Sequence, residues 1–249
     1  ELHDLKIQAY DPAALKASGV QFVFSALPAE VAQDIELDLK DRGFSVFSNA
    51  ASLRYEKNVP ILIPEANAEQ LDLVPLQGYP KTGSVVTNAN CATTGLAVAL
   101  APLKKYGIKE ISVSSYQSIS GAGYPGLSAL DISGNVIPYI GGEEEKVEKE
   151  IKKILDIDPE VFAYCIRVPV MFGHLESVWV EFDKEVTPED VIRDWNDYKG
   201  FPHLPSSPAQ PIVYSAEDKF PQSKLAFWGT PRGMVVYTGR LKKKGNRIG

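Results

Sequence analysis

Short apolar runs alternate with amphipathic stretches through the first 107 residues, and this alternation constrains the fold more than any other feature of the sequence. The apolar runs are rich in Val, Phe and Ile, as buried strands are. The amphipathic stretches between them, Ala29–Arg42 and Cys91–Tyr106, carry apolar residues at helical spacing, and a glycine follows each. Strands that alternate with helices predict βαβ units on a largely parallel sheet. The predicted strands are Gln21–Ala26, Phe44–Phe47, Pro60–Ile63 and Ser84–Thr87.

The second half of the chain has longer strand candidates and a highly charged helix. Glu143–Leu155 predicts that helix, and Thr187 with Pro188 predicts the start of another. We therefore expect an α/β protein in which a nucleotide-binding type of parallel sheet is followed by an α+β region with a mixed sheet. The seam is expected near Asn90. The predicted strands here are Glu110–Ile119, Ala163–Val170, Ser177–Phe182 and Gly233–Lys243, of which the second and third look antiparallel across a short turn.

Composition and charge exclude several classes of protein. The 249 residues are 44% hydrophobic and 23% charged, which is ordinary for a globular chain and excludes collagen and disordered chains. A net charge of −6 offers no electrostatic surface for nucleic acid, although a small anionic substrate needs only a few local cations. The longest apolar stretch, Leu96–Pro102, is far shorter than a membrane span, and we see no secretory signal or disulfide framework. We expect a cytoplasmic protein.

Cys91 is the most informative residue for chemistry. It stands at the end of a predicted strand and begins a predicted helix, so free backbone N–H groups and the positive helix end face its sulfur. That setting is expected to lower the thiol pKa and favour the nucleophilic thiolate, although a buried structural cysteine would fit the position too. Cys165 lies inside a predicted strand and is expected to be inert core.

Arg167 and His174 form a second candidate group. Arg167 lies in an otherwise apolar strand, and a buried arginine is costly unless a carboxylate pairs with it. His174 follows a turn glycine, where an imidazole can project into a cleft. Glu143 and Lys146 begin the charged helix, where acidic residues suit the helix dipole. The two share a face that would offer an anion for an amine and a cation for a phosphate.

The loop Gly121–Gly126 matches the G-x-G-x-x-G spacing of dinucleotide-binding turns but not their context. Such a turn follows the first strand and opens a helix, whereas this loop follows a long strand in mid-chain and contains Pro125. Two interpretations stay open. One is a tight Gly/Pro turn, and the other is a loop whose backbone N–H groups approach a phosphate or a ring.

Taken together, these residues resemble aspartate-β-semialdehyde dehydrogenase of the archaeal and fungal type, over nearly the whole chain. The resemblance implies a partial dinucleotide-binding domain, residues 1–90, and a catalytic and dimerisation domain, residues 91–249. The matching segments are Thr87–Gly95 (TNANCATTG), Gln117 with Ser120–Gly123, Arg167–Val170 with Gly173–His174, Pro138–Ile140 followed by Glu143–Lys146, Ser25–Pro28 and Pro64–Asn67.

The resemblance implies a role for each matching residue. Cys91 matches the nucleophile, Gln117 the residue that orients the thiohemiacetal, and His174 the acid/base. Arg167 matches the group that binds the substrate carboxylate, and Glu143 the group that binds the substrate amine.

Further positions match the contacts of the substrates and the cofactor. Asn90 matches a substrate-binding position, and Arg54 and Lys146 match phosphate-binding positions. The expected cofactor is NADP, no metal is required, and the expected assembly is a homodimer or homotetramer with neither nucleic acid nor membrane as partner. The positions that match NADP contacts are Ser25, Leu27, Asn49, Ser120, Gly121 and Gly123.

The implied reaction passes through a cysteine thioester. In the oxidative direction the thiolate attacks the aldehyde, a hydride passes to NADP, and phosphate releases the acyl group as aspartyl phosphate. The reverse reaction belongs to the biosynthesis of lysine, threonine and methionine. The family's glycine-rich first turn would precede residue 1, and its last helix would follow Gly249. A partial chain and a truncated form without NADP binding therefore both stay open.

Three other functions stay open. Malonyl-CoA reductase is the nearest enzyme, but Asn90 before the cysteine and an amine-binding Glu143 favour the semialdehyde enzyme. N-acetyl-glutamyl-phosphate reductase fits less well around the cysteine and the histidine. A non-catalytic dimerisation module, with the second-half sheet as its interface, is the alternative of another class.

Overall fold

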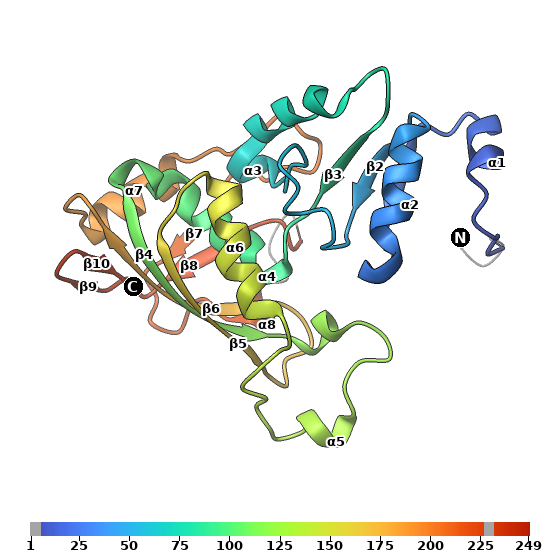
Figure 1. Ribbon diagram of the computed structural model, residues 1–249. Helices are drawn as coiled ribbons and strands as arrows, with labels where there is room; N and C mark the ends of the chain where they lie inside the picture. The colour runs from blue at the N-terminus through green and yellow to red at the C-terminus, as the bar shows by residue number, and fades with distance from the viewer. Residues whose placement is uncertain (1–5, 227–231) are drawn as a thin grey trace. The chain divides into compact units, whose positions relative to one another are not determined.

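The computed structural model describes residues 6–226 and 232–249, and the chain divides into two compact units (Figure 1). Unit 1 comprises Glu1–Pro60 and Gln70–Asn88, and unit 2 comprises Ile61–Glu69 and Ala89–Gly249. Each unit has its own sheet and its own hydrophobic core. Among the described residues, no helix combines the length and the apolar character that crossing a bilayer requires.

Unit 1 contains a parallel sheet of three strands in the order β1-β2-β3. Helix α2 (Ala29–Asp41) connects the first two strands, and its buried Leu39 packs with Phe44, Val46 and Val85. Gly83 leads into the third strand where only a glycine fits, because a Cβ there would lie 1.8 Å from the carbonyl oxygen of Phe44. The unit's other elements are α1 (Pro12–Ala17), β1 (Phe22–Ser25), β2 (Ser45–Ser48), η3 (Pro75–Gln77) and β3 (Ser84–Thr87).

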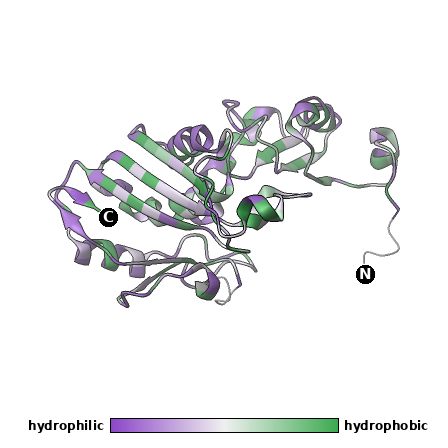
Figure 2. Ribbon diagram, turned by 90° about the horizontal axis from the view of Figure 1, so that it is seen from below, coloured by the Kyte–Doolittle hydropathy of each residue, from purple (hydrophilic) through white to green (hydrophobic). Residues whose placement is uncertain are grey.

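Unit 2 is built on a mixed sheet of five strands in the order β5-β4-β6-β10-β9. The central β4 (Ile108–Gln117) runs parallel to β5 (Glu160–Arg167) and antiparallel to β6 (Leu175–Phe182). Figure 2 shows hydrophobic and hydrophilic bands alternating along these strands, as a sheet with one buried face requires. The last two strands are β9 (Lys243–Lys244) and β10 (Arg247–Ile248).

Helices α4 (Cys91–Leu100) and α6 (Glu143–Leu155) pack together in the core of unit 2. Apolar residues at helical spacing explain this packing, since Leu96 and Leu100 of α4 and Ile151 and Ile154 of α6 are all buried. The remaining elements of the unit are α3 (Pro64–Asn67), η4 (Ala101–Tyr106), η5 (Ile119–Ala122), α5 (Ala129–Ile132), α7 (Pro188–Asp197), β7 (Ile212–Ser215), α8 (Ser223–Ala226) and β8 (Val236–Gly239); η2 (Ala68–Leu73) spans both units.

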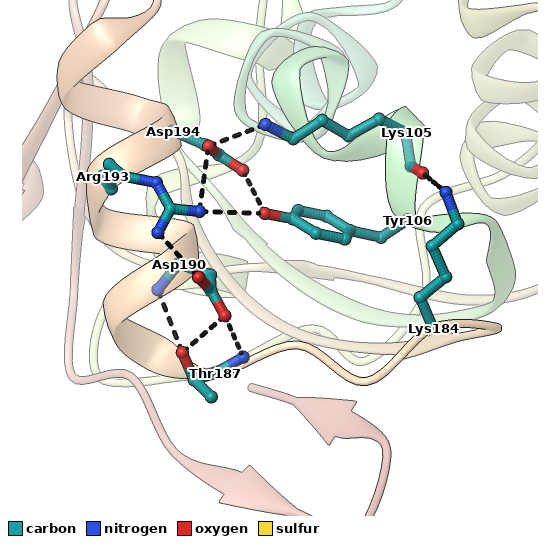
Figure 3. A network of polar contacts seen from close by, with 7 residues as sticks. All are labelled: Lys105, Tyr106, Lys184, Thr187, Asp190, Arg193 and Asp194. Carbon is teal, nitrogen blue, oxygen red and sulfur yellow. Dashed lines mark hydrogen bonds and ion pairs between the residues drawn. The ribbon is translucent and has the colours of Figure 1, made fainter.

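A polar network fastens α7 to η4 (Figure 3). Asp194 is 7% exposed, and its carboxylate accepts from Lys105 Nζ at 2.8 Å and from the Tyr106 hydroxyl at 2.6 Å. The helix itself starts with a capping box, in which Thr187 and Asp190 satisfy each other's backbone N–H groups. The start of α7 is thus the one that the sequence predicts.

The structure confirms the predicted fold class, a parallel sheet followed by an α+β region with a mixed sheet, and corrects several of its parts. Pro60–Ile63 is not a strand, since only Ile61 forms a bridge. The segment resembles a buried strand in sequence because its two isoleucines are buried in the core of unit 2. The predicted helix Cys91–Tyr106 turns into a 3₁₀ helix at Ala101, because Pro102 has no N–H to continue the α-helix.

The predicted strands of the second half also need two corrections. Strands β5 and β6 run in opposite directions as expected, but β4 lies between them, so they do not form a hairpin. The predicted last strand, Gly233–Lys243, is divided between β8 and β9. The parallel pair of β7 and β8 was not predicted.

Candidate active site

Cys91 is the first residue of α4, and Asn90 caps that helix. The Asn90 side-chain oxygen accepts from the backbone N–H groups of Ala92 at 3.0 Å and of Thr93 at 3.4 Å. The Cys91 N–H lies outside this cap, and the N–H groups of Cys91 and Ala92 both act on the sulfur. Cys91 is exposed, whereas Cys165 is fully buried, as expected of a core residue.

Helix α6 places two carboxylates on Asn90. Glu143 accepts from the Asn90 side-chain nitrogen at 2.6 Å, and Glu150 accepts from the Asn90 backbone N–H at 2.6 Å. Lys146 forms an ion pair with Glu143 at 2.7 Å, so the predicted anion and cation of this helix are neighbours. The sequence analysis missed Glu150.

Arg167 and His174 meet at Ser118, which directly follows β4. The Arg167 guanidinium, 5% exposed, donates to the Ser118 carbonyl oxygen at 2.6 Å. The Ser118 backbone N–H donates to Nδ1 of His174 at 3.1 Å. One backbone residue therefore orients both predicted side chains, and the proton of the neutral imidazole belongs on Nε2.

The loop after β4 lies against these two side chains. A Cβ on Gly121 would lie 3.0 Å from Nη1 of Arg167 and 3.5 Å from Cε1 of His174, so glycine permits this approach. Ser120 shares a hydrogen bond with the Ser118 hydroxyl at 3.0 Å, and Gly123 has a positive φ of 71°. The predicted loop residues are thus grouped beside Arg167 and His174.

Gln117 is the last residue of β4 and pairs in register with Arg167 of β5. It is 1% exposed, and its side-chain amide donates to the Ser115 hydroxyl at 3.2 Å. The strand register therefore fixes the position of Gln117 relative to the carboxylate-binding candidate.

The charges of this group act on one another. The protein desolvates the Cys91 sulfur and Glu143 repels its negative charge, and together they raise the pKa of the Cys91 thiol despite the N–H groups of Ala92 and Cys91 and the charge of Arg167. The expectation of a lowered thiol pKa is therefore wrong in this structure. Burial and Arg167 lower the pKa of His174, although Glu143 opposes them.

The pKa values of Glu143 and Cys165 are shifted as well. Burial would raise the pKa of Glu143, but its hydrogen bonds from Lys146 and Asn90 outweigh burial and lower it. Burial raises the pKa of Cys165 to about 11, which keeps that thiol protonated. Glu143 is therefore an anion at neutral pH, and Cys91 is the more accessible of the two thiols.

The predicted residues of unit 1 form a second group at the carboxyl ends of β1 and β2. The buried Ser25 hydroxyl donates to Glu36 at 2.5 Å, and the Asn49 backbone N–H donates to the Ser25 carbonyl at 2.8 Å. The guanidinium of Arg54, 6% exposed, donates to the Asn49 carbonyl at 3.0 Å. Leu27 is half-buried in the loop that follows β1.

The sequence analysis missed Glu36, which is fully buried and also accepts from the Ser48 hydroxyl at 2.6 Å. A signal was present, because Glu36 interrupts the apolar stripe of α2 between Ala32 and Leu39. Among the described residues, no three His, Cys, Asp or Glu side chains lie where they could hold a metal ion.

Comparisons with known proteins agree over both units. Residues 1–74 match the family model of the semialdehyde dehydrogenase NAD binding domain, and residues 100–247 match that of the semialdehyde dehydrogenase dimerisation domain. The aspartate-semialdehyde dehydrogenase of Archaeoglobus fulgidus is 41% identical, over 98% of this chain and 73% of the relative. The enzyme of the same name from Schizosaccharomyces pombe is 38% identical, over 97% of this chain and 73% of the relative.

Two further proteins bear on the choice of function. The crystal structure of aspartate semialdehyde dehydrogenase with NADP from Candida albicans has a TM-score of 0.80 and 33% identity, over 92% of this chain and 71% of that chain. The malonyl CoA reductase (NADP) of Metallosphaera sedula is 32% identical, over 98% of this chain and 72% of the relative.

Proposed function

The chain belongs to the semialdehyde dehydrogenase family, and from this premise we propose that it interconverts aspartate-β-semialdehyde plus phosphate and aspartyl phosphate, with NADP as the redox partner. The observation that carries the proposal is the grouping in unit 2 of an exposed thiol at a helix start with His174, Arg167 and Glu143. Reduction of aspartyl phosphate in this way serves the biosynthesis of the aspartate-derived amino acids.

The substrate's two charged groups find complementary partners. A planar carboxylate suits the guanidinium of Arg167, which is already held by the Ser118 carbonyl. The α-ammonium suits Glu143, whose pKa is lowered and whose carboxylate is therefore charged. Both groups act electrostatically on Cys91, so a substrate held between them has its reacting carbon near the sulfur.

The covalent chemistry belongs to Cys91 and His174. The Cys91 thiolate attacks the carbonyl carbon and forms a thiohemiacetal or, from aspartyl phosphate, a thioester with release of phosphate. The backbone N–H of Cys91, which lies outside the Asn90 cap, stabilises the developing oxyanion. His174 presents Nε2 to that oxygen, because Ser118 occupies Nδ1. Gln117, fixed in register with Arg167, orients the intermediate.

The described residues fit a dinucleotide at two places. The carboxyl ends of parallel strands β1 and β2 offer Ser25, Leu27 and Asn49, where nucleotides bind in open α/β sheets. The buried Ser25 hydroxyl donates its hydrogen bond to Glu36, so Ser25 contacts a ligand as an acceptor or through its backbone. NADP, when bound, supplies or accepts the hydride at the carbon that Cys91 holds.

In unit 2, the loop of Ser120, Gly121 and Gly123 carries the other positions that the resemblance assigns to NADP contacts. Its close approach to Arg167 and His174 brings it beside the groups that hold the substrate. We place the cofactor-binding domain at residues 1–90 and the catalytic and dimerisation domain at residues 91–249. For phosphate, the candidate in unit 2 is Lys146, which forms an ion pair with Glu143, and the candidate in unit 1 is Arg54, which donates to the Asn49 carbonyl.

The protein forms a homo-oligomer through unit 2. The face of β5 that is turned away from the core exposes Phe162 at 52% and Tyr164 at 64%, which suits a self-complementary interface. A dimer through this face is the smallest assembly, and a tetramer would pair two such dimers. We place the enzyme in the cytoplasm, where its cysteines stay reduced.

A direct test follows the reduction of NADP when semialdehyde, phosphate and NADP are added together. Mass spectrometry of a reaction without phosphate should find the aspartyl thioester on the peptide of Cys91 and not on that of Cys165. Omission of phosphate should stop turnover after one thioester per site. An acyl adduct formed from malonyl-CoA in preference to the semialdehyde would favour the malonyl-CoA reductase, against which Glu143 argues because that substrate has no amine.

A further inference from the structure

Helix α6 reaches one residue, Asn90, with two carboxylates. Glu143 and Glu150 are seven residues apart, which places them on the same face of the helix two turns from each other. Glu143 accepts the side-chain N–H of Asn90, and Glu150 accepts its backbone N–H, each at 2.6 Å. Glu143 has a role in the proposed function, whereas Glu150 has none.

The buried position of the Glu150 carboxylate is energetically unfavourable. It is 0% exposed and interrupts the apolar stripe that Val147, Ile151 and Ile154 form on the inner side of α6. A carboxylate in such a position destabilises the folded chain unless hydrogen bonds satisfy it. The neighbouring Glu148 is half-buried and accepts a more distant backbone N–H, that of Ala163 at 3.3 Å.

The bond from Asn90 fixes the peptide directly before the nucleophile. Asn90 has φ −58° and ψ 145°, so the backbone turns there from an extended conformation into the helix that Cys91 begins. The Asn90 backbone N–H lies outside the helix's own hydrogen-bond pattern and needs a separate acceptor. Glu150 is that acceptor, and it therefore fixes the orientation of the first turn of α4.

We propose that Glu150 is a positioning residue for Cys91, acting through the Asn90 backbone N–H to keep the first N–H groups of α4 on the sulfur. The proposal rests on the proposed function only for the role of Cys91 as nucleophile. The charged groups that act on the sulfur directly are Glu143 of α6 and Arg167 of β5, and the N–H groups of Cys91 and Ala92 favour the thiolate. Glu150 acts on the sulfur through the backbone.

Three substitutions distinguish the effect of the hydrogen-bond acceptor at Glu150 from the effects of its charge and of its side-chain size. Glu150→Gln keeps an oxygen in place without the charge, Glu150→Asp keeps the charge but shortens the side chain, and Glu150→Ala removes both. Glu148→Gln is the matched control, since it changes a carboxylate of the same helix that bonds to β5 and not to Asn90.

The readout is the pH dependence of Cys91 alkylation by iodoacetamide, located by mass spectrometry and measured on the chain without substrate or cofactor. Glu150→Gln and Glu148→Gln should keep the midpoint of the parent chain. Glu150→Asp and Glu150→Ala should raise the midpoint by about one pH unit, which means about 10-fold slower labelling below it. Amide exchange of the Asn90 N–H should be slow in the parent chain and fast in Glu150→Asp.

Either of two results overturns the proposal. One is a parental midpoint in folded Glu150→Asp or Glu150→Ala, and the other is an upward shift in Glu150→Gln as large as in Glu150→Asp. Fast exchange of the Asn90 N–H in the parent chain would overturn it without any variant. A missing acyl adduct on Cys91 with these midpoint shifts intact would overturn the proposed function and leave the positioning role standing.

Discussion

The backbone N–H of Ser118 donates to Nδ1 of His174 at 3.1 Å. Because Nδ1 accepts this bond, the neutral ring carries its proton on Nε2 and faces a substrate as a hydrogen-bond donor. Protonation of Nδ1 would turn two N–H groups toward each other and break the bond. The imidazole is thus arranged to remain neutral, and burial and Arg167 lower its pKa in the same sense.

The titration of His174 should therefore lie below the ordinary value of 6.5. The folded chain resists the proton that the unfolded chain accepts, so this residue's contribution to stability is present above pH 6.5 and is lost as the pH falls below it. Proton NMR of the ring checks the pKa, and urea unfolding at several pH values checks the stability. A ring that titrates above 6.5 would contradict the arrangement.

Glu143→Gln should change thiol reactivity and catalysis in opposite directions. Removing the carboxylate charge removes a repulsion from the Cys91 thiolate, so the thiol pKa falls and iodoacetamide labelling at neutral pH becomes faster. The semialdehyde loses its ammonium partner, and kcat/KM should fall about 10- to 150-fold.

An aldehyde without the amine is the control for Glu143→Gln, because it does not use this carboxylate and should lose much less. Equal losses for the two aldehydes would reduce Glu143 to an ordinary acid of the first helical turn.

Gly121→Ala should weaken substrate binding with little effect on folding. The new methyl group would lie 3.0 Å from Nη1 of Arg167 and displace the guanidinium from its carboxylate-binding position. KM for the semialdehyde should rise about 10-fold, as expected for partial loss of a charged hydrogen bond. Gly141→Ala, where a Cβ meets nothing within 4 Å, is the control and should leave KM unchanged.

Asp194→Ala should destabilise unit 2 without changing Cys91 labelling. The substitution leaves the Tyr106 hydroxyl and Lys105 without their shared carboxylate and should lower the free energy of unfolding by about 1.5–3 kcal/mol. Arg193→Ala removes exposed contacts of the same network and should cost less than about 1 kcal/mol. Urea unfolding measures both, and equal losses would show that the Asp194 carboxylate is not the centre of the network.

The local pattern of the sequence was sufficient where an element's own residues determine it. Strand β3 and helix α6 have the predicted boundaries. Strand β3 is a fully buried run that follows Gly83, and α6 follows Gly142 and buries apolar residues at helical spacing. Strand pairing depends on residues far apart in the chain, so the sequence did not show that β4 lies between β5 and β6.

The candidate site divides in the same way. Cys91 and Asn90 are adjacent in sequence and mark a strand end and a helix start, so they could be recognised directly. Glu150 binds a backbone N–H sixty residues away, and only the packing of α6 on α4 brings it there. The predicted lowering of the Cys91 pKa was wrong for a related reason. That pKa depends on desolvation and on Glu143, and the local sequence of α4 shows neither.

The short segment Ile61–Glu69 belongs to unit 2 although residues of unit 1 flank it on both sides. Its Asn67 is fully buried and donates to the carbonyl oxygens of Ile61 at 2.8 Å and Ile154 at 3.3 Å. A recombinant chimera made by joining two homologous genes at residue 90 would therefore combine this segment from one parent with α6 from the other. Gene shuffling in this family should tolerate crossovers at residue 90 only when the parent that supplies residues 1–90 has an asparagine at position 67.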